Sequence, residues 1–64
     1  PQAKIEVFRP HATGDKTPLC LNDPRLIAIV SDAQLDIDQP VFAIHDIASV
    51  ATFLKAHFGP YLQP

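Results

Sequence analysis

Hydrophobic and polar residues alternate near the start of the chain. Ile5 and Val7 fall on one side of an extended segment, and Phe8 falls on the other. Side chains on a strand point to opposite faces with a period of two residues. The pattern therefore predicts a strand near residues 4–9, which Pro10 ends because proline has no N–H for the strand ladder.

The apolar run in the middle of the chain has two interpretations. Its β-branched residues, such as Ile29 and Val30, suit a buried strand, which we predict over residues 25–31. Asp23-Pro24 is also typical of a helix N-cap followed by proline at the first helical position. A helix over residues 24–34 is therefore the alternative.

The last part of the chain predicts a short strand that leads directly into one helix. Residues 41–45 suit a strand, and Pro40 suits its start. Asp46 stands where an N-cap is expected, and Gly59-Pro60 stands where a helix is expected to stop. Residues 46–58 carry one broad apolar stripe and form the predicted helix.

These elements predict a single small domain over residues 1–64, of the α+β class. We expect the three strands to form a mostly antiparallel sheet, with the C-terminal helix packed on one of its faces. If residues 24–34 form a helix instead, the arrangement becomes βαβα.

The length of the chain favours a partner. A chain of 64 residues buries only about 60% of its unfolded surface, so it is marginally stable alone. Cys20 is the only cysteine and cannot form an internal disulfide. Oligomerisation or a protein partner is therefore expected to supply stability, and the lone thiol fits a reducing, cytoplasmic location.

Aromatic residues on the sheet and helix give the functional prediction. One helix can cover one face of the sheet and leaves the other face uncovered. Aromatic side chains on such a face are enriched at protein interfaces. We predict a non-catalytic protein-interaction module (a regulator, inhibitor or assembly subunit) that self-associates or covers a partner. The candidate interface residues are Phe8, Phe42, Val50, Phe53 and His57.

A zinc-binding protein is the alternative function. His11, Cys20 and His45 have the side-chain types that zinc prefers. No two of them have the short spacing of a zinc half-site. His45 and His57 bracket the predicted helix and would stand roughly 18 Å apart, so one ion could use only one of them.

Charge, hydrophobicity and glycine content argue against several other functions. The net charge is −2, and the five basic residues are scattered singly, so nucleic-acid binding is not expected. No apolar run approaches the roughly 20 residues of a membrane span. With two glycines the chain cannot form a glycine-rich phosphate loop. We expect no enzyme activity and no cofactor.

Residues 35–58 combine an acidic loop with a short amphipathic helix. This resembles the closing part of an acyl or peptidyl carrier domain, a family of all-helical proteins. The family's mark is an Asp-Ser pair whose serine carries phosphopantetheine. Here Asp23 is followed by proline and Asp46 by isoleucine. A carrier-like domain that lacks the attachment serine is therefore the third hypothesis.

Overall fold

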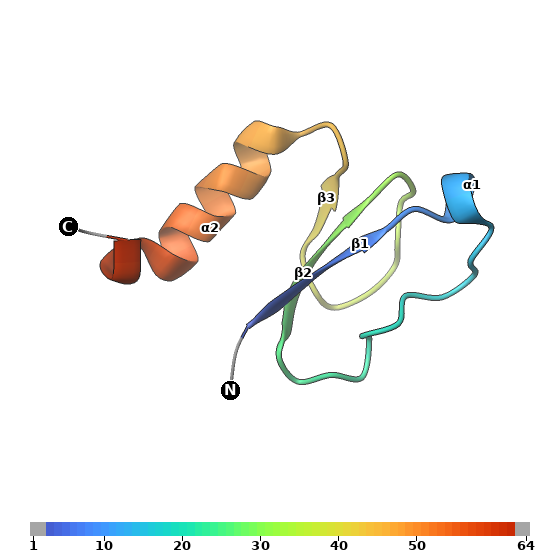
Figure 1. Cartoon of the computed structure of the whole chain (residues 1–64), viewed down its shortest axis with the longest axis horizontal. Coiled ribbons are helices and arrows are strands. Elements are labelled where there is room, and N and C mark those ends of the chain that lie inside the picture. The colour runs from blue at the N-terminus through green and yellow to red at the C-terminus, as the bar shows by residue number, and fades with distance from the viewer. Residues whose placement is uncertain (1–2, 63–64) are drawn as a thin grey trace.

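The computed structural model describes residues 3–62, which form three strands and two helices. Strands β1 (Lys4–Phe8), β2 (Leu26–Ser31) and β3 (Val41–Ala43) make one sheet in the order β1-β2-β3 (Figure 1). The short helix α1 (Pro10–Thr13) follows β1, and α2 (Ile47–Leu62) follows β3. The α+β class and the positions of the three predicted strands are confirmed.

Both strand pairs are parallel, so the prediction of a mostly antiparallel sheet is wrong. Antiparallel neighbouring strands can be joined by a tight hairpin. Parallel strands need a longer crossover connection, which brings the chain back to the end of the sheet where the first strand began. Residues 9–25 and 32–40 provide these two connections. Only the first of them contains a helix, the single turn of α1, so the connections are mainly irregular chain.

Strand β2 occupies the segment for which a helix over residues 24–34 was the alternative, so that alternative is wrong. Ala28 and Ile29 are each 0% exposed although they point to opposite faces of the sheet. A central parallel strand is buried on both faces, and it therefore reads as a continuous apolar run. This explains why the pattern alone could not separate a strand from a helix.

The core lies on one face of the sheet, beneath both connections. Its buried cluster contains Phe8, Leu26 and Ile29. The partly buried residues that pack against this cluster are Cys20 and Leu21 from the first connection, and Leu35 and Ile37 from the second. The irregular connections thus cover the face that helices cover in larger parallel sheets.

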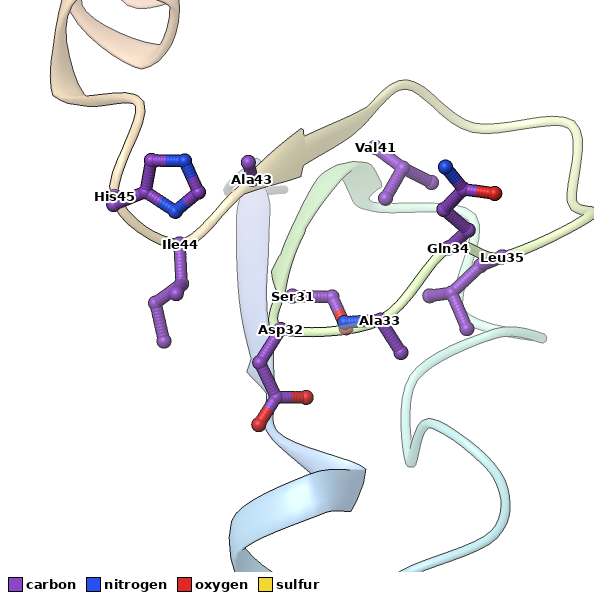
Figure 2. A pocket seen from close by; sticks show the side chains of 9 residues that line it. All are labelled: Ser31, Asp32, Ala33, Gln34, Leu35, Val41, Ala43, Ile44 and His45. Atoms are coloured by element: carbon purple, nitrogen blue, oxygen red, sulfur yellow. The ribbon is translucent and has the colours of Figure 1, made fainter.

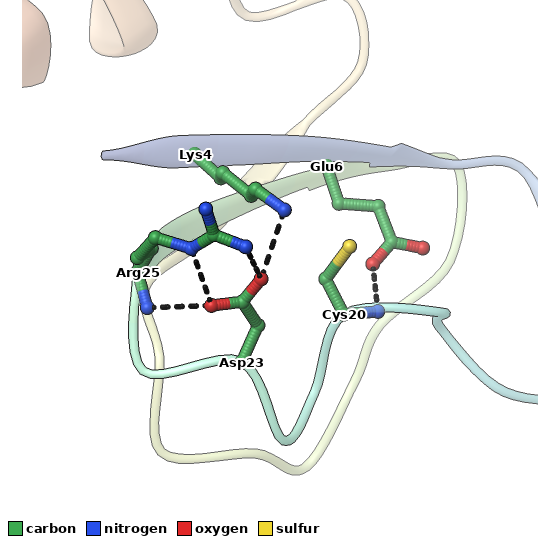
Figure 3. A network of polar contacts seen from close by, with 5 residues as sticks. All are labelled: Lys4, Glu6, Cys20, Asp23 and Arg25. Carbon is green, nitrogen blue, oxygen red and sulfur yellow. Dashed lines mark hydrogen bonds and ion pairs between the residues drawn. The ribbon is translucent and has the colours of Figure 1, made fainter. Parts of the chain in front are cut away.

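Two carboxylates tie the first connection to the sheet (Figure 3). Glu6 on β1 accepts the backbone N–H groups of residues 19–20, each at 2.8 Å. Asp23 accepts hydrogen bonds from Lys4 Nζ at 2.9 Å and from Arg25 Nη2 at 3.0 Å. The connection is therefore fixed by polar contacts as well as by its apolar side chains.

Helix α2 begins where the sequence predicts and ends later. Asp46 Oδ1 accepts the N–H of Ser49 at 3.1 Å, which is the bond that an N-cap makes. The helix continues to Leu62, so the predicted stop at Gly59-Pro60 is wrong. A residue before proline is normally driven from the helical conformation partly by a clash of its Cβ, and Gly59 has no Cβ.

Helix α2 does not pack along either face of the sheet, as Figure 1 shows, so that part of the prediction is wrong. Among the described elements, extensive contacts join only the neighbouring strands. The radius of gyration is 12.4 Å, against about 10.7 Å for a compact domain of this length. The short link at residues 44–46 starts the helix beside the edge strand β3, from which it extends away.

Candidate protein-interaction surface

The face of the sheet opposite the core carries a row of apolar side chains. The register places Val7 beside Val30, and Val30 beside Phe42. Ile5 lies on the same face because side chains alternate along β1. Val7 is 61% exposed, and the other three are half-buried. These four residues, which we call the open face, lie opposite the face that the two connections cover.

The register also separates Phe8 from Phe42, which had been expected to share an uncovered face. Phe8 pairs with Ser31 and lies in the core, with 5% of its surface exposed. Phe8 therefore belongs to the core and offers almost no surface to a partner. Alternation shows which residues of one strand share a face, but the face that the connections cover is decided by their path.

Three of the other candidates come together where α2 meets the sheet. The ring of Phe53 lies 5.2 Å from that of Phe42 and 5.9 Å from that of His57. The His57 ring in turn lies 4.6 Å from the ring of Phe58. Centroid separations of about 4.5–7 Å are those of favourable aromatic pairs. The structure thus joins the open face to the flank of α2 by a continuous series of rings.

A hollow of about 380 Å³ lies between β3 and the first turns of α2. It is lined by Phe42, Ala48, Ser49, Thr52 and Phe53. The two phenylalanine rings thus leave open space beside them, which a side chain of a partner could fill.

Helix α2 carries a second set of apolar side chains along one side. Ile47 is 76% exposed, and Val50, Leu54 and Phe58 are half-buried. Their spacing of three or four residues places them in one row, which we call the α2 stripe. An isolated helix of this length is marginal in water, and packing of such a stripe normally stabilises it.

The two carboxylates with lowered pKa values both have structural explanations. Hydrogen bonds from Arg25, and then from Lys4, hold the pKa of Asp23 well below its usual range. Hydrogen bonding from Ser49 lowers the pKa of Asp46, which follows from its role as the N-cap. Neither carboxylate therefore has the environment of a catalytic acid or base.

The three predicted zinc ligands stand on different segments. Cys20 packs against the core from the first connection, His11 lies on α1, and His45 lies on the link before α2. Within residues 3–62, no group of three or more His, Cys, Asp or Glu side chains is placed to hold a metal ion. The zinc hypothesis thus gains no candidate centre from the geometry.

Comparison with protein-family models, with curated proteins and with solved structures finds no match for this chain. Its three-stranded sheet also differs from the all-helical carrier domains that residues 35–58 resemble. Neither helix of the described residues is both long enough and apolar enough to cross a bilayer. Its function is therefore inferred from its own geometry.

Proposed function

We propose that the chain is a non-catalytic protein-interaction module of the cytoplasm that self-associates, with α2 of each copy covering the open face of the other. The observation that carries this proposal is that residues 3–62 of one chain have two apolar surfaces without a packing partner. Helix α2 reaches the open face at Phe42, through Phe53, but it makes no extensive contact with any strand of the described residues, so the open face and the α2 stripe do not pack on each other. Parallel sheets are almost always covered on both faces. A reciprocal exchange between two copies supplies both missing contacts.

The accessible surface area of the chain supports a second copy as the partner. The chain exposes 4933 Å², whereas a compact monomer of 7.0 kDa exposes about 4000 Å². The excess of about 900 Å² is close to the roughly 800 Å² that each partner buries in an interface of standard size. The chain thus exposes about as much extra surface as each partner of a stable dimer would bury.

The two surfaces also match in chemistry. The open face and the α2 stripe consist of apolar residues alone, and the one residue of α2 with a formal charge at pH 7 is the exposed Lys55. Bringing the surfaces together buries no unpaired charge, which is the usual obstacle to burial. Because each copy gives one helix and receives one, a twofold arrangement closes at two chains.

Sedimentation equilibrium over a wide range of concentration tests the proposal. We expect the mass to move from one chain to two, and Val7→Lys to weaken association by at least about tenfold because it places a charge in the interface. Val7 is 61% exposed, so the substitution does not disturb the core. Leu19→Lys is the matched control, since Leu19 is 94% exposed on the connection that covers the other face.

A strictly monomeric chain at the highest concentration would overturn the proposal, as would equal weakening by the two variants. The helix side is tested by Ile47→Lys, with Ala56→Lys on the opposite side of α2 as its control. Dimers mixed from labelled and unlabelled chains should show NOEs between the methyl groups of Val7 and Leu54. Dimers without these NOEs would contradict the exchange of α2.

A further inference from the structure

A cavity of about 510 Å³ lies where β2 and β3 end (Figure 2). One wall comes from Ser31 and Asp32 at the end of β2, and another from residues 43–45 at the end of β3. The carboxyl ends of parallel strands are where open parallel sheets bind their ligands. The volume falls within the range of small-molecule sites, about 300–1,000 Å³. The position and the size both point to a ligand.

The walls of the cavity are mainly apolar. Leu35 reaches it from the second connection, Val41 from the start of β3, and Ile44 from just beyond β3 (Figure 2). These branched side chains give the cavity a surface suited to a hydrocarbon body.

The one charged group of the cavity is an acceptor, whereas Ser31, Gln34 and His45 add polar groups that can both donate and accept. Asp32 is the one residue with a formal charge at pH 7 among those that line it, and no Lys or Arg lies beside it there. Ser31 is 2% exposed, and its Oγ accepts the N–H of Ala33 at 3.1 Å, which leaves a second lone pair. The backbone N–H of His11 donates to Asp32 Oδ1 at 3.4 Å. The second carboxylate oxygen, Oδ2, is left for a ligand. An anion would find no counter-charge here, whereas a cation would.

We propose that this cavity binds a small organic ammonium ion. Its hydrocarbon body lies against Leu35, Val41 and Ile44, and its N–H groups donate to Asp32 and to Ser31. An ammonium has three donors and no acceptor, which matches a carboxylate beside a hydroxyl oxygen. The site is independent of the proposed self-association, because it uses neither the open face nor the α2 stripe.

Three probes with the same ring separate the contributions of charge and shape. The labelled chain is titrated with cyclohexylammonium, cyclohexanol or cyclohexanecarboxylate at neutral pH, and its amide spectrum is followed. We expect saturable shifts at Asp32, Ala33 and His45 with the ammonium. The alcohol should bind about tenfold more weakly, since it lacks the charge-assisted bond. The carboxylate should give no saturable shift.

Variants test the assigned residues. Asp32→Asn should weaken ammonium binding by about tenfold and leave alcohol binding unchanged. Asp36→Asn is the matched control, because Asp36 is an exposed carboxylate of the same connection that does not line the cavity. Ala43→Leu should weaken both ligands by filling the space. Failure of the ammonium to saturate, equal binding of the carboxylate, or unchanged binding by Asp32→Asn would each overturn the proposal.

Discussion

Asp23 shows how one carboxylate can join segments that are distant in the sequence. It accepts the backbone N–H of Arg25 at 2.9 Å and two bonds from the guanidinium, each at 3.0 Å. Lys4, at the start of β1, adds a further bond at 2.9 Å. The side chain is 18% exposed, so its charge is partly shielded from water. The residue thereby fastens the turn before β2 to the neighbouring strand.

Replacing Asp23 should make the melting temperature less dependent on pH in the acidic range. Its folded-state pKa is lowered, chiefly by Arg25, so its contribution is full above the unfolded pKa of about 3.9 and is lost as pH falls below it. We expect Asp23→Asn to lower the melting temperature by a few degrees at neutral pH. The difference from the unmodified chain should shrink steadily between pH values of about 4 and 2. Thermal unfolding followed by circular dichroism measures this.

Asp38→Asn is the control for Asp23, since Asp38 is an exposed carboxylate on the other connection. It should change neither the melting temperature nor its slope with pH. If both variants lost the same stability at neutral pH, net charge rather than the contacts of Asp23 would be responsible.

At the scale of elements, features set by neighbouring residues were predicted better than the routes of the connections between strands. The N-cap at Asp46 could be identified from the sequence because its bond partner is three residues away. The strand at residues 41–43 could be placed because Pro40 marks its start. Strand direction was not predictable in this way, because it depends on where the connections run. The connection at residues 9–25 packs Cys20 and Leu21 against one face of the sheet and leads to a parallel neighbour, whereas a tight hairpin would reverse the chain.

The cap at Asp46 should control the order of α2 more than that of the sheet. Because α2 has few contacts with the strands, its first turn depends on the bond from Ser49. We expect Asp46→Ala to speed amide exchange in residues 49–53 several-fold and to leave β2 unchanged. Hydrogen exchange followed by NMR measures both segments in one sample.

Asp46→Ser keeps an acceptor at the N-cap and should restore slow exchange. The lowered pKa of Asp46 means that its charged form is the bonded one, so the cap should weaken in the unmodified chain as pH falls below about 4. Faster exchange throughout the chain in Asp46→Ala would show that α2 is coupled to the core after all.

At the scale of the whole molecule, the candidate surface was only partly predictable. Phe53 and His57 were both named from the sequence, and their rings lie 5.9 Å apart because residues four apart share one side of a helix. Val7 was missed, since the sequence suggested that its side of β1 packs beneath the helix. No local signal could have corrected this, because the exposure of Val7 depends on the path of the two connections and on the position of α2.

Self-association through these surfaces should make the stability of the chain depend on its concentration. A partner that binds the folded state alone raises the melting temperature by mass action, and a folded dimer is such a partner for each of its chains. The buried core of residues 3–62 is small, so the contribution of the interface should form a large part of the total stability. We therefore expect the melting temperature to rise steadily with chain concentration in calorimetry. Val7→Lys should flatten this dependence, whereas Leu19→Lys should keep it. If the melting temperature of the unmodified chain were equal at all concentrations, contact between the open face of one copy and the α2 stripe of another would not stabilise the fold.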